Sequence, residues 1–203
     1  FPVTAGGAQP TNSAPAIGNE EAFVARLTAD LTVINQATYY GSFGTEDVSN
    51  SLAIHPTTGE VYVAGQTNLS AALPGTTGGA QPASGGSQDM FVVRFGAALT
   101  TLGQATYLGG TDIEGIDTYV VDDGIGRSLI IHPGTGDIYV SGFTDSANFP
   151  GTGGGAQSAR RGTRDGFVAW LNAGLTTLNQ ATYAGGFNAD GIQLLKEMDK
   201  AGM

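Results

Sequence analysis

The sequence predicts an all-β fold assembled from repeated antiparallel sheets. Two four-residue words, Gln-Ala-Thr-Tyr and Gly-Gly-Ala-Gln, each occur three times, and successive copies are 68 to 76 residues apart. The words begin at Gln36, Gln104 and Gln180, and at Gly6, Gly78 and Gly154. Between them lie short runs of Val, Ile, Tyr and Phe bounded by Gly, Pro, Asp and Thr, which is typical of strands and turns. Glycine makes up 33 of the 203 residues, about twice its usual share, which suits a chain with many turns.

Each full repeat is expected to supply four strands. In the most regular copy the strand-like runs span 51–56, 60–65, 89–95 and 105–110, and the next copy has them at 128–133, 137–142, 165–171 and 181–186. Four antiparallel strands in one repeat form a blade of a β-propeller. Because side chains alternate along a strand, one set should be buried between neighbouring blades. We expect that set to include Tyr62, Phe91, Val93, Tyr139, Phe167 and Ala169.

The repeat divides the chain into about two and a half blades. Residues 1–50 form an N-terminal half-blade and its connecting loop, 51–110 a blade, 111–127 an acidic inter-blade loop, 128–186 a second blade and 187–203 a C-terminal tail. In the tail, Leu194, Leu195 and Met198 recur at helical spacing, which predicts a short amphipathic helix. Such a helix serves either as a cap on an exposed blade face or as a docking segment.

The repeated words also follow the order of a known family. Asp-x-Phe-Val-x-x-Leu, Thr-Tyr-x-Gly-Gly, Val-Tyr-Val-x-Gly-x-Thr and Phe-Pro together resemble the bacterial seven-bladed β-propeller repeat, usually called the SBBP repeat. The resemblance covers most of residues 1–186 and implies a propeller in an exported, surface-associated bacterial protein. The family has no single defined activity, so no catalytic residue is implied. One departure is the run Ile-His-Pro, beginning at Ile54 and Ile131, where the family often has Val-Asp before a Gly turn.

Composition and charge argue against several kinds of partner. The net charge is −10, and the basic residues Arg160, Arg161 and Arg164 form one small loop cluster rather than a stripe, so nucleic acid is not expected to bind. No apolar run approaches the roughly 20 residues that cross a bilayer, so no membrane span is expected. The absence of Cys excludes disulfides and thiol nucleophiles. The start at Phe1 lacks the features of a signal peptide, from which we expect a processed product or a piece of a longer chain.

The repeat itself explains the residues that would first be considered catalytic. His55 and His132 occupy the same position in two copies, so a structural role, such as a turn hydrogen bond, is preferred over metal binding or proton transfer. Glu21, Asp89 and Asp165 recur just before the third strand and are interpreted as turn or strand-entry acids, and the Gly-Gly pairs as turn glycines. No catalytic triad or phosphate-binding loop can be assembled from residues unique to one copy. The sequence therefore predicts no catalytic and no cofactor-binding residue.

One segment breaks the repeat. Nine residues are added to the loop between the two blades, and this loop carries five acids. They are Asp112, Glu114, Asp117, Asp122 and Asp123. Crowded carboxylates either spread into solvent or bind a cation, and carboxylate oxygens in a flexible loop suit calcium. Both interpretations remain open, a solvated acidic loop and a calcium site, and the spacing is not that of an EF-hand.

These observations predict a non-enzymatic module of an exported or cell-surface bacterial protein, which binds a protein or a glycan or forms a structural part of a surface assembly. The alternative is a fragment of a propeller enzyme, of lyase or hydrolase type, whose catalytic residues lie in other blades. An open arc of blades leaves an apolar face uncovered at each end. We therefore expect the surface of residues 1–40, or the face beside residues 192–198, to be covered by another protein chain or by further blades.

Overall fold

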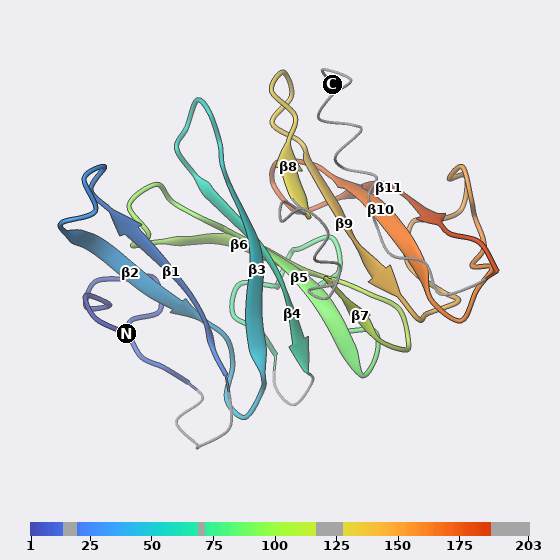
Figure 1. Ribbon diagram of the computed structural model, residues 1–203, viewed down its shortest axis with the longest axis horizontal. Coiled ribbons are helices and arrows are strands. Elements are labelled where there is room, and N and C mark those ends of the chain that lie inside the picture. The colour runs from blue at the N-terminus through green and yellow to red at the C-terminus, as the bar shows by residue number, and fades with distance from the viewer. Residues whose placement is uncertain (14–19, 69–71, 117–127, 188–203) are drawn as a thin grey trace.

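The computed structural model describes residues 1–13, 20–68, 72–116 and 128–187, and within them the chain is all β. The strands form three open antiparallel sheets, which follow one another in chain order along the long axis of the molecule (Figure 1). None of the described segments is a helix of the length and apolar character that crossing a membrane requires. The all-β class predicted from the sequence is confirmed, and the helix predicted in the tail lies outside the described residues.

The first sheet contains β1 (Ala22–Leu27) and β2 (Ile34–Tyr40). The second has the order β3-β4-β5-β6, with β3 (Asp47–Ile54), β4 (Val61–Asn68), β5 (Gln88–Phe95) and β6 (Leu102–Leu108). The third has the order β11-β10-β9-β7, with β8 also paired to β9. Its strands are β7 (Glu114–Gly115), β8 (Leu129–Ile131), β9 (Ile138–Thr144), β10 (Asp165–Leu171) and β11 (Leu178–Ala184). Because β7 and β8 pair with different parts of β9, together they take the outer position that β3 has in the second sheet.

The last two strands of every sheet have the same register. Phe23 pairs with Tyr39, Phe91 with Tyr107 and Phe167 with Tyr183. In all three pairs the register shifts at the same place, immediately before Leu27, Phe95 and Leu171. The sequence repeat is therefore a structural repeat, in which β1 and β2 correspond to the third and fourth strands of the other sheets.

The two repeated words meet in space. In the second sheet the Gln104 side chain donates to the Gly75 carbonyl at 2.7 Å, and Thr106 Oγ1 accepts the backbone N–H of Gln81 at 2.8 Å. The corresponding side chains of the other two sheets are Gln36, Thr38, Gln180 and Thr182. Each word thus ties the loop that precedes the third strand to the fourth strand, which explains why both words are kept in every copy.

The apolar core lies between successive sheets. On the second sheet, Val63 and Phe91 share one buried cluster with Tyr40 of the first sheet. Tyr62 and Val92, on the opposite face, belong to the cluster formed with the third sheet. The second sheet is therefore buried on both faces, and the sheets stack face to face. Of the six residues expected between blades, Tyr139 is partly exposed and the other five are buried.

Two boundaries differ from the sequence-based expectation. Strand β3 begins at Asp47, four residues before the expected start of the blade at 51, because its first residues pair with the end of β4. Strand β7 lies within the segment 111–127 that was expected to be a loop. It pairs with the end of β9, so the added residues interrupt the outer strand of the third sheet rather than only joining two sheets.

Candidate functional site

The histidines make turn hydrogen bonds, as the sequence predicted. His55 Nδ1 accepts the backbone N–H groups of Thr57 and Thr58 at 3.3 and 3.2 Å. His132 Nδ1 accepts those of Gly134 and Thr135 at 3.2 and 3.1 Å. Each imidazole therefore holds the turn between the first and second strands of its sheet. Among the described residues, no group of three His, Asp or Glu side chains is arranged to hold a metal ion.

The repeated acids bind backbone N–H groups, which agrees with their prediction as turn acids. Asp89 Oδ2 accepts the N–H of Gly85 at 2.7 Å. Asp165 accepts the N–H groups of Arg161 and Gly162 at 2.9 and 2.8 Å. Glu21 does the same in the first repeat, where its Oε2 accepts the N–H of Ser13 at 2.6 Å. These carboxyls fix the loop ahead of the third strand, a role that is structural in every copy.

Two of these carboxyls, those of Glu21 and Asp89, each have a second acid beside them at a junction between sheets. In the first junction it is Asp47, which lies with Glu21 against Gly41. In the second junction it is Glu114, which lies with Asp89 against Gly109. Asp89 and Glu114 are both fully buried, and Asp89 Oδ1 has no hydrogen-bond donor among the described residues. Burial raises the pKa of Asp89 to about 6, and the nearby Glu114 carboxyl adds to that rise.

The glycine between the two acids is required by their approach. A Cβ atom added at Gly109 would lie 2.5 Å from Glu114 Oε2 and would clash with Asp89 Oδ1. Gly109 does not have a positive φ angle. The interpretation of the Gly-Gly pairs as turn glycines is therefore wrong for this position, where the missing side chain is what matters. It is correct for Gly78 of the other word, whose φ is 81°.

The acidic loop is only partly described. Glu114 is buried, and its carboxylate accepts the Gly110 N–H at 2.8 Å and the Thr144 hydroxyl at 2.6 Å. Asp112 is exposed, and its backbone N–H donates to Ser146 Oγ at 2.8 Å. Asp117, Asp122 and Asp123 lie outside the described residues, so the five-residue calcium site stays a prediction.

The basic cluster is bound within the molecule. Arg164 forms two hydrogen bonds with the Asp145 carboxylate, at 2.7 and 2.8 Å, and its guanidinium lies 3.9 Å from the centre of the Phe143 ring. Arg160 donates to the carbonyls of Asp145 and Thr163. Arg160 and Arg164 therefore bind the loop ahead of β10 to the segment that follows β9. The positive charge of Arg164 is paired with the Asp145 carboxylate.

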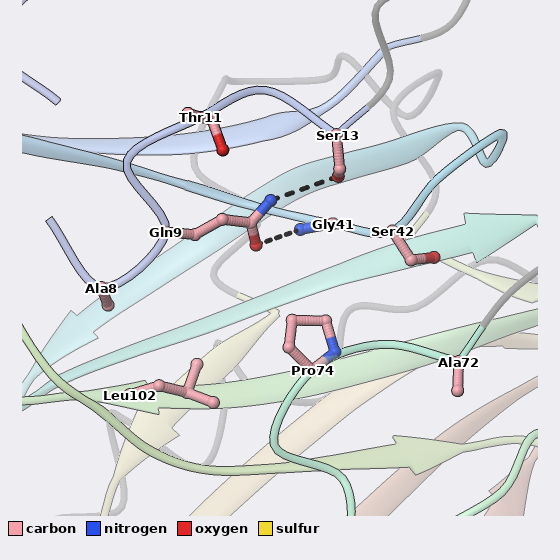
Figure 2. Close-up of a pocket in the computed structure, with 9 residues that line it drawn as sticks. All are labelled: Ala8, Gln9, Thr11, Ser13, Gly41, Ser42, Ala72, Pro74 and Leu102. Carbon is pink, nitrogen blue, oxygen red and sulfur yellow. Dashed lines mark hydrogen bonds between the residues drawn. The ribbon is translucent and has the colours of Figure 1, made fainter.

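A groove of about 380 Å³ lies where the first sheet meets the second. Its lining is Ala8, Gln9, Thr11, Ser13, Gly41, Ser42, Ala72, Pro74 and Leu102 (Figure 2). Gln9 accepts the Gly41 N–H at 3.2 Å and donates to Ser13 Oγ at 3.2 Å, so its amide is held in a fixed orientation. None of the nine side chains is charged, and the polar groups are hydroxyls, an amide and backbone. The groove suits an uncharged ligand that exchanges hydrogen bonds and contacts Pro74 and Leu102.

The corresponding space between the second and third sheets is occupied. Asn148 stands there at the position of Ala72, and its Oδ1 accepts the backbone N–H and the hydroxyl of Thr111 at 3.1 and 3.0 Å. A Cβ atom at Gly110, the counterpart of Ser42, would lie 2.7 Å from Asn148 Oδ1. The small Ala72 leaves the first junction open. The groove is therefore a feature that breaks the repeat.

Sequence reasoning did not identify this groove. The signal was present in the difference between Ala72 and Asn148 at equivalent positions, but its meaning depends on the contact of Asn148 with Thr111. No protein-family model and no curated protein match this chain.

Proposed function

We propose that the chain is a non-enzymatic β-propeller repeat module of an exported or cell-surface bacterial protein, and that it binds a protein or a glycan. The second and third sheets each have four antiparallel strand positions, the second packs on the β1–β2 pair, and the third packs on the second. This arrangement supports blades of a propeller. Bacterial origin and export rest on the resemblance of the repeated words to the SBBP repeat. A role as a structural part of a surface assembly is compatible with the same architecture.

The observation that carries a binding role is the uncharged groove between the first and second sheets. The groove departs from the repeat, since Ala72 replaces the bridging Asn148 of the next junction. Hydroxyl and amide groups such as those of Thr11 and Gln9 pair with sugar hydroxyls as both donors and acceptors. A neutral glycan is the ligand class that this lining favours.

The alternative, a propeller enzyme of lyase or hydrolase type, would need accessible acid and base groups. Asp89 and Glu114 are the carboxyl pair with the most suitable chemistry, because one of them has a raised pKa. Both are fully buried, so a substrate does not reach them. Their contacts with backbone N–H groups account for them as structural acids. The described residues therefore favour binding over catalysis.

Partners that extend the stack belong to the same proposal. Strand β1 pairs only with β2 within the described residues, whereas β5 and β10, at the same position of their sheets, pair on both edges. A free strand edge is a site for further pairing. Further blades of the same protein or another chain would complete the propeller there.

The glycan proposal is tested by closing the groove. Ala72→Asn introduces the side chain that fills the second junction, and we expect it to weaken the binding of neutral oligosaccharides on a glycan array at least about tenfold. Ala159→Asn, at an exposed position in the loop ahead of β10, makes the same chemical addition outside the groove and should leave binding unchanged. If Ala72→Asn did not weaken sugar binding, the sugar would bind outside the groove, and the proposed site would be wrong. Cleavage of a bound sugar would favour the enzyme.

A further inference from the structure

The outer face of the first sheet exposes apolar side chains that are buried in both other repeats. Phe23, Leu27 and Leu31 are 46%, 42% and 74% exposed. Their counterparts in the second repeat are Phe91, Phe95 and Leu99, at 0%, 0% and 1%, and those in the third are Phe167, Leu171 and Leu175, all at 0%. Phe1 stacks on Phe23 with ring centres 4.2 Å apart and extends the same exposed face. Burial of these positions elsewhere depends on the preceding sheet, which contributes the other half of each cluster.

Each buried junction is closed by the same contact. Leu99 lies in the turn that follows the third strand, and its carbonyl accepts the backbone N–H of Ala8, in the Gly-Gly-Ala-Gln word of the preceding repeat, at 2.9 Å. The Leu175 carbonyl accepts the N–H of Ala80 in the same way at 2.9 Å. Both leucines have left-handed backbones, with φ of 60° and 58°, as does Leu31 at 60°. The leucine turn of one repeat is thus a plug, and the Gly-Gly-Ala-Gln word of the repeat before it is the matching socket.

Within the described part of the chain, the socket of the third repeat has no plug. Ala156 is the counterpart of Ala8 and Ala80, whose side chains pack against the junction clusters, whereas Ala156 is exposed and no described residue accepts its N–H. Tyr139 is the counterpart of Tyr62, which donates its hydroxyl to the Ala173 carbonyl across the second junction at 2.8 Å. Tyr139 makes no such bond to a described residue. Among the residues that the structure describes, the plug on the first sheet and the socket on the third are therefore both unfilled.

We propose that two copies of this chain associate head to tail, with the Leu31 plug of one copy in the Ala156 socket of the next. The Leu31 carbonyl accepts the Ala156 N–H, and the Tyr139 hydroxyl donates to the carbonyl of Ala29, which is the counterpart of Ala173. The exposed apolar face around Phe23 and Leu27 is covered by the third sheet of the second copy. The proposal deepens the role as part of an assembly and rests on it. Because the two contacting surfaces differ, the contact is heterologous and produces a closed ring or an open chain of copies.

The proposal is tested with one variant for each end of the molecule. Leu31→Asp removes the plug, and the left-handed backbone there tolerates Asp better than Leu. Ala156→Glu blocks the socket at an exposed position. Phe43→Asp is the control, because Phe43 is 73% exposed, as Leu31 is, but lies in the β2–β3 turn. Masses are measured by sedimentation over a range of concentrations, at moderate salt to screen the net charge of −10.

The natural chain and Phe43→Asp should exceed the monomer mass increasingly as concentration rises. Leu31→Asp alone and Ala156→Glu alone should stay monomeric, because each lacks one half of the contact. An equal mixture of the two should form dimers and nothing larger, through the intact socket of the first and the intact plug of the second. A monomeric natural chain, a mixture that stays monomeric, or association of Leu31→Asp like that of the natural chain would overturn the proposal. Groove binding by a monomeric chain would leave the proposed binding function intact.

Discussion

Gly41, Gly109 and Gly185 do not have positive φ angles, yet a side chain on any of them would meet a carboxyl group. At Gly109 the obstructing atoms come from Asp89, at the start of β5, and from Glu114 in β7. Two acids from different sheets approach each other only because no Cβ atom stands between them. Glycine recurs at this position because the packing leaves no room for a side chain. The acids recur because their carboxyl groups accept backbone N–H groups of the loop.

Gly109→Ala should destabilise the protein. The added methyl group meets two carboxyls in a closed junction, and overpacking of this kind costs about 1–3 kcal/mol. Gly153→Ala is the matched control, because no atom lies within 4 Å of the added Cβ and Gly153 has no positive φ. That change should be neutral or stabilise by about 0.4–1 kcal/mol, through the unfolded chain. Urea denaturation measures both free energies of unfolding, and equal losses would contradict the packing argument.

Asp89→Asn should change how stability depends on pH. In the folded chain the pKa of Asp89 is raised from 3.8 to about 6, by burial and then by the Glu114 carboxyl, while the Gly85 N–H and Ser84 act in the opposite direction. The folded protein therefore binds more protons than the unfolded chain between these values, and this carboxyl lowers stability as pH rises from about 4 to about 6.

Asn cannot ionise, so the stability of Asp89→Asn does not fall in this way as the pH rises. Its melting temperature relative to the natural protein should rise between pH 4 and pH 7, a window set by the shifted pKa. Thermal melts in matched buffers give the comparison, and Asp145→Asn, at a partly exposed carboxyl paired with Arg164, serves as the control. A difference that is constant over this range would mean that folding does not raise the pKa of Asp89.

At the scale of elements, the loop that precedes the third strand shows one position under strain. Its backbone is left-handed in all three repeats, with φ of 59° at Val3, 76° at Gly75 and 73° at Gly151. The carbonyl of this residue accepts the N–H of the fourth strand, at Ala37 in the first repeat, at 2.9 Å. The bond fixes the conformation, and a β-branched residue adopts it at a cost.

Val3→Gly should therefore stabilise the first repeat by about 1 kcal/mol, because the left-handed penalty is removed and Val3 is about half exposed. The reverse change, Gly151→Val, should destabilise the third repeat by a similar amount or more, since a Cβ there would lie 2.7 Å from Leu178 Cδ2. Hydrogen exchange at Ala37 and Ala181 reports each repeat separately. Faster exchange at Ala37 in Val3→Gly would contradict this account.

At the scale of the whole molecule, the sequence predicted what is local and periodic. The recurring words, the apolar alternation and the turn role of His55 and His132 depend on neighbouring residues, and the structure confirms them. The pairing of Asp89 with Glu114 depends on contacts between sheets, which the sequence pattern does not encode. The same is true of the groove at Ala72. The calcium interpretation of the acidic loop remains a prediction, because three of its five residues lie outside the described part of the chain.

The central claim is that successive repeats stack through their faces and are closed by the leucine plug. Leu31 and Leu175 are the same residue at the same position with nearly the same backbone, φ 60° and 58°, but Leu31 is exposed and Leu175 is buried against the preceding sheet. Truncating each leucine to Ala removes the same atoms from the same backbone conformation. The difference in lost stability between the two variants therefore measures the contribution of packing against the preceding sheet.

The most direct measurement is the free energy of unfolding of Leu175→Ala and Leu31→Ala by urea denaturation, at concentrations where the chain is monomeric. Leu175→Ala should lose about 2–5 kcal/mol, because it leaves a cavity between two sheets. Leu31→Ala should stay within about 0.5 kcal/mol of the natural protein, as changes at exposed positions do. Equal losses for the two variants, or no loss for Leu175→Ala, would contradict the stacked arrangement of the repeats.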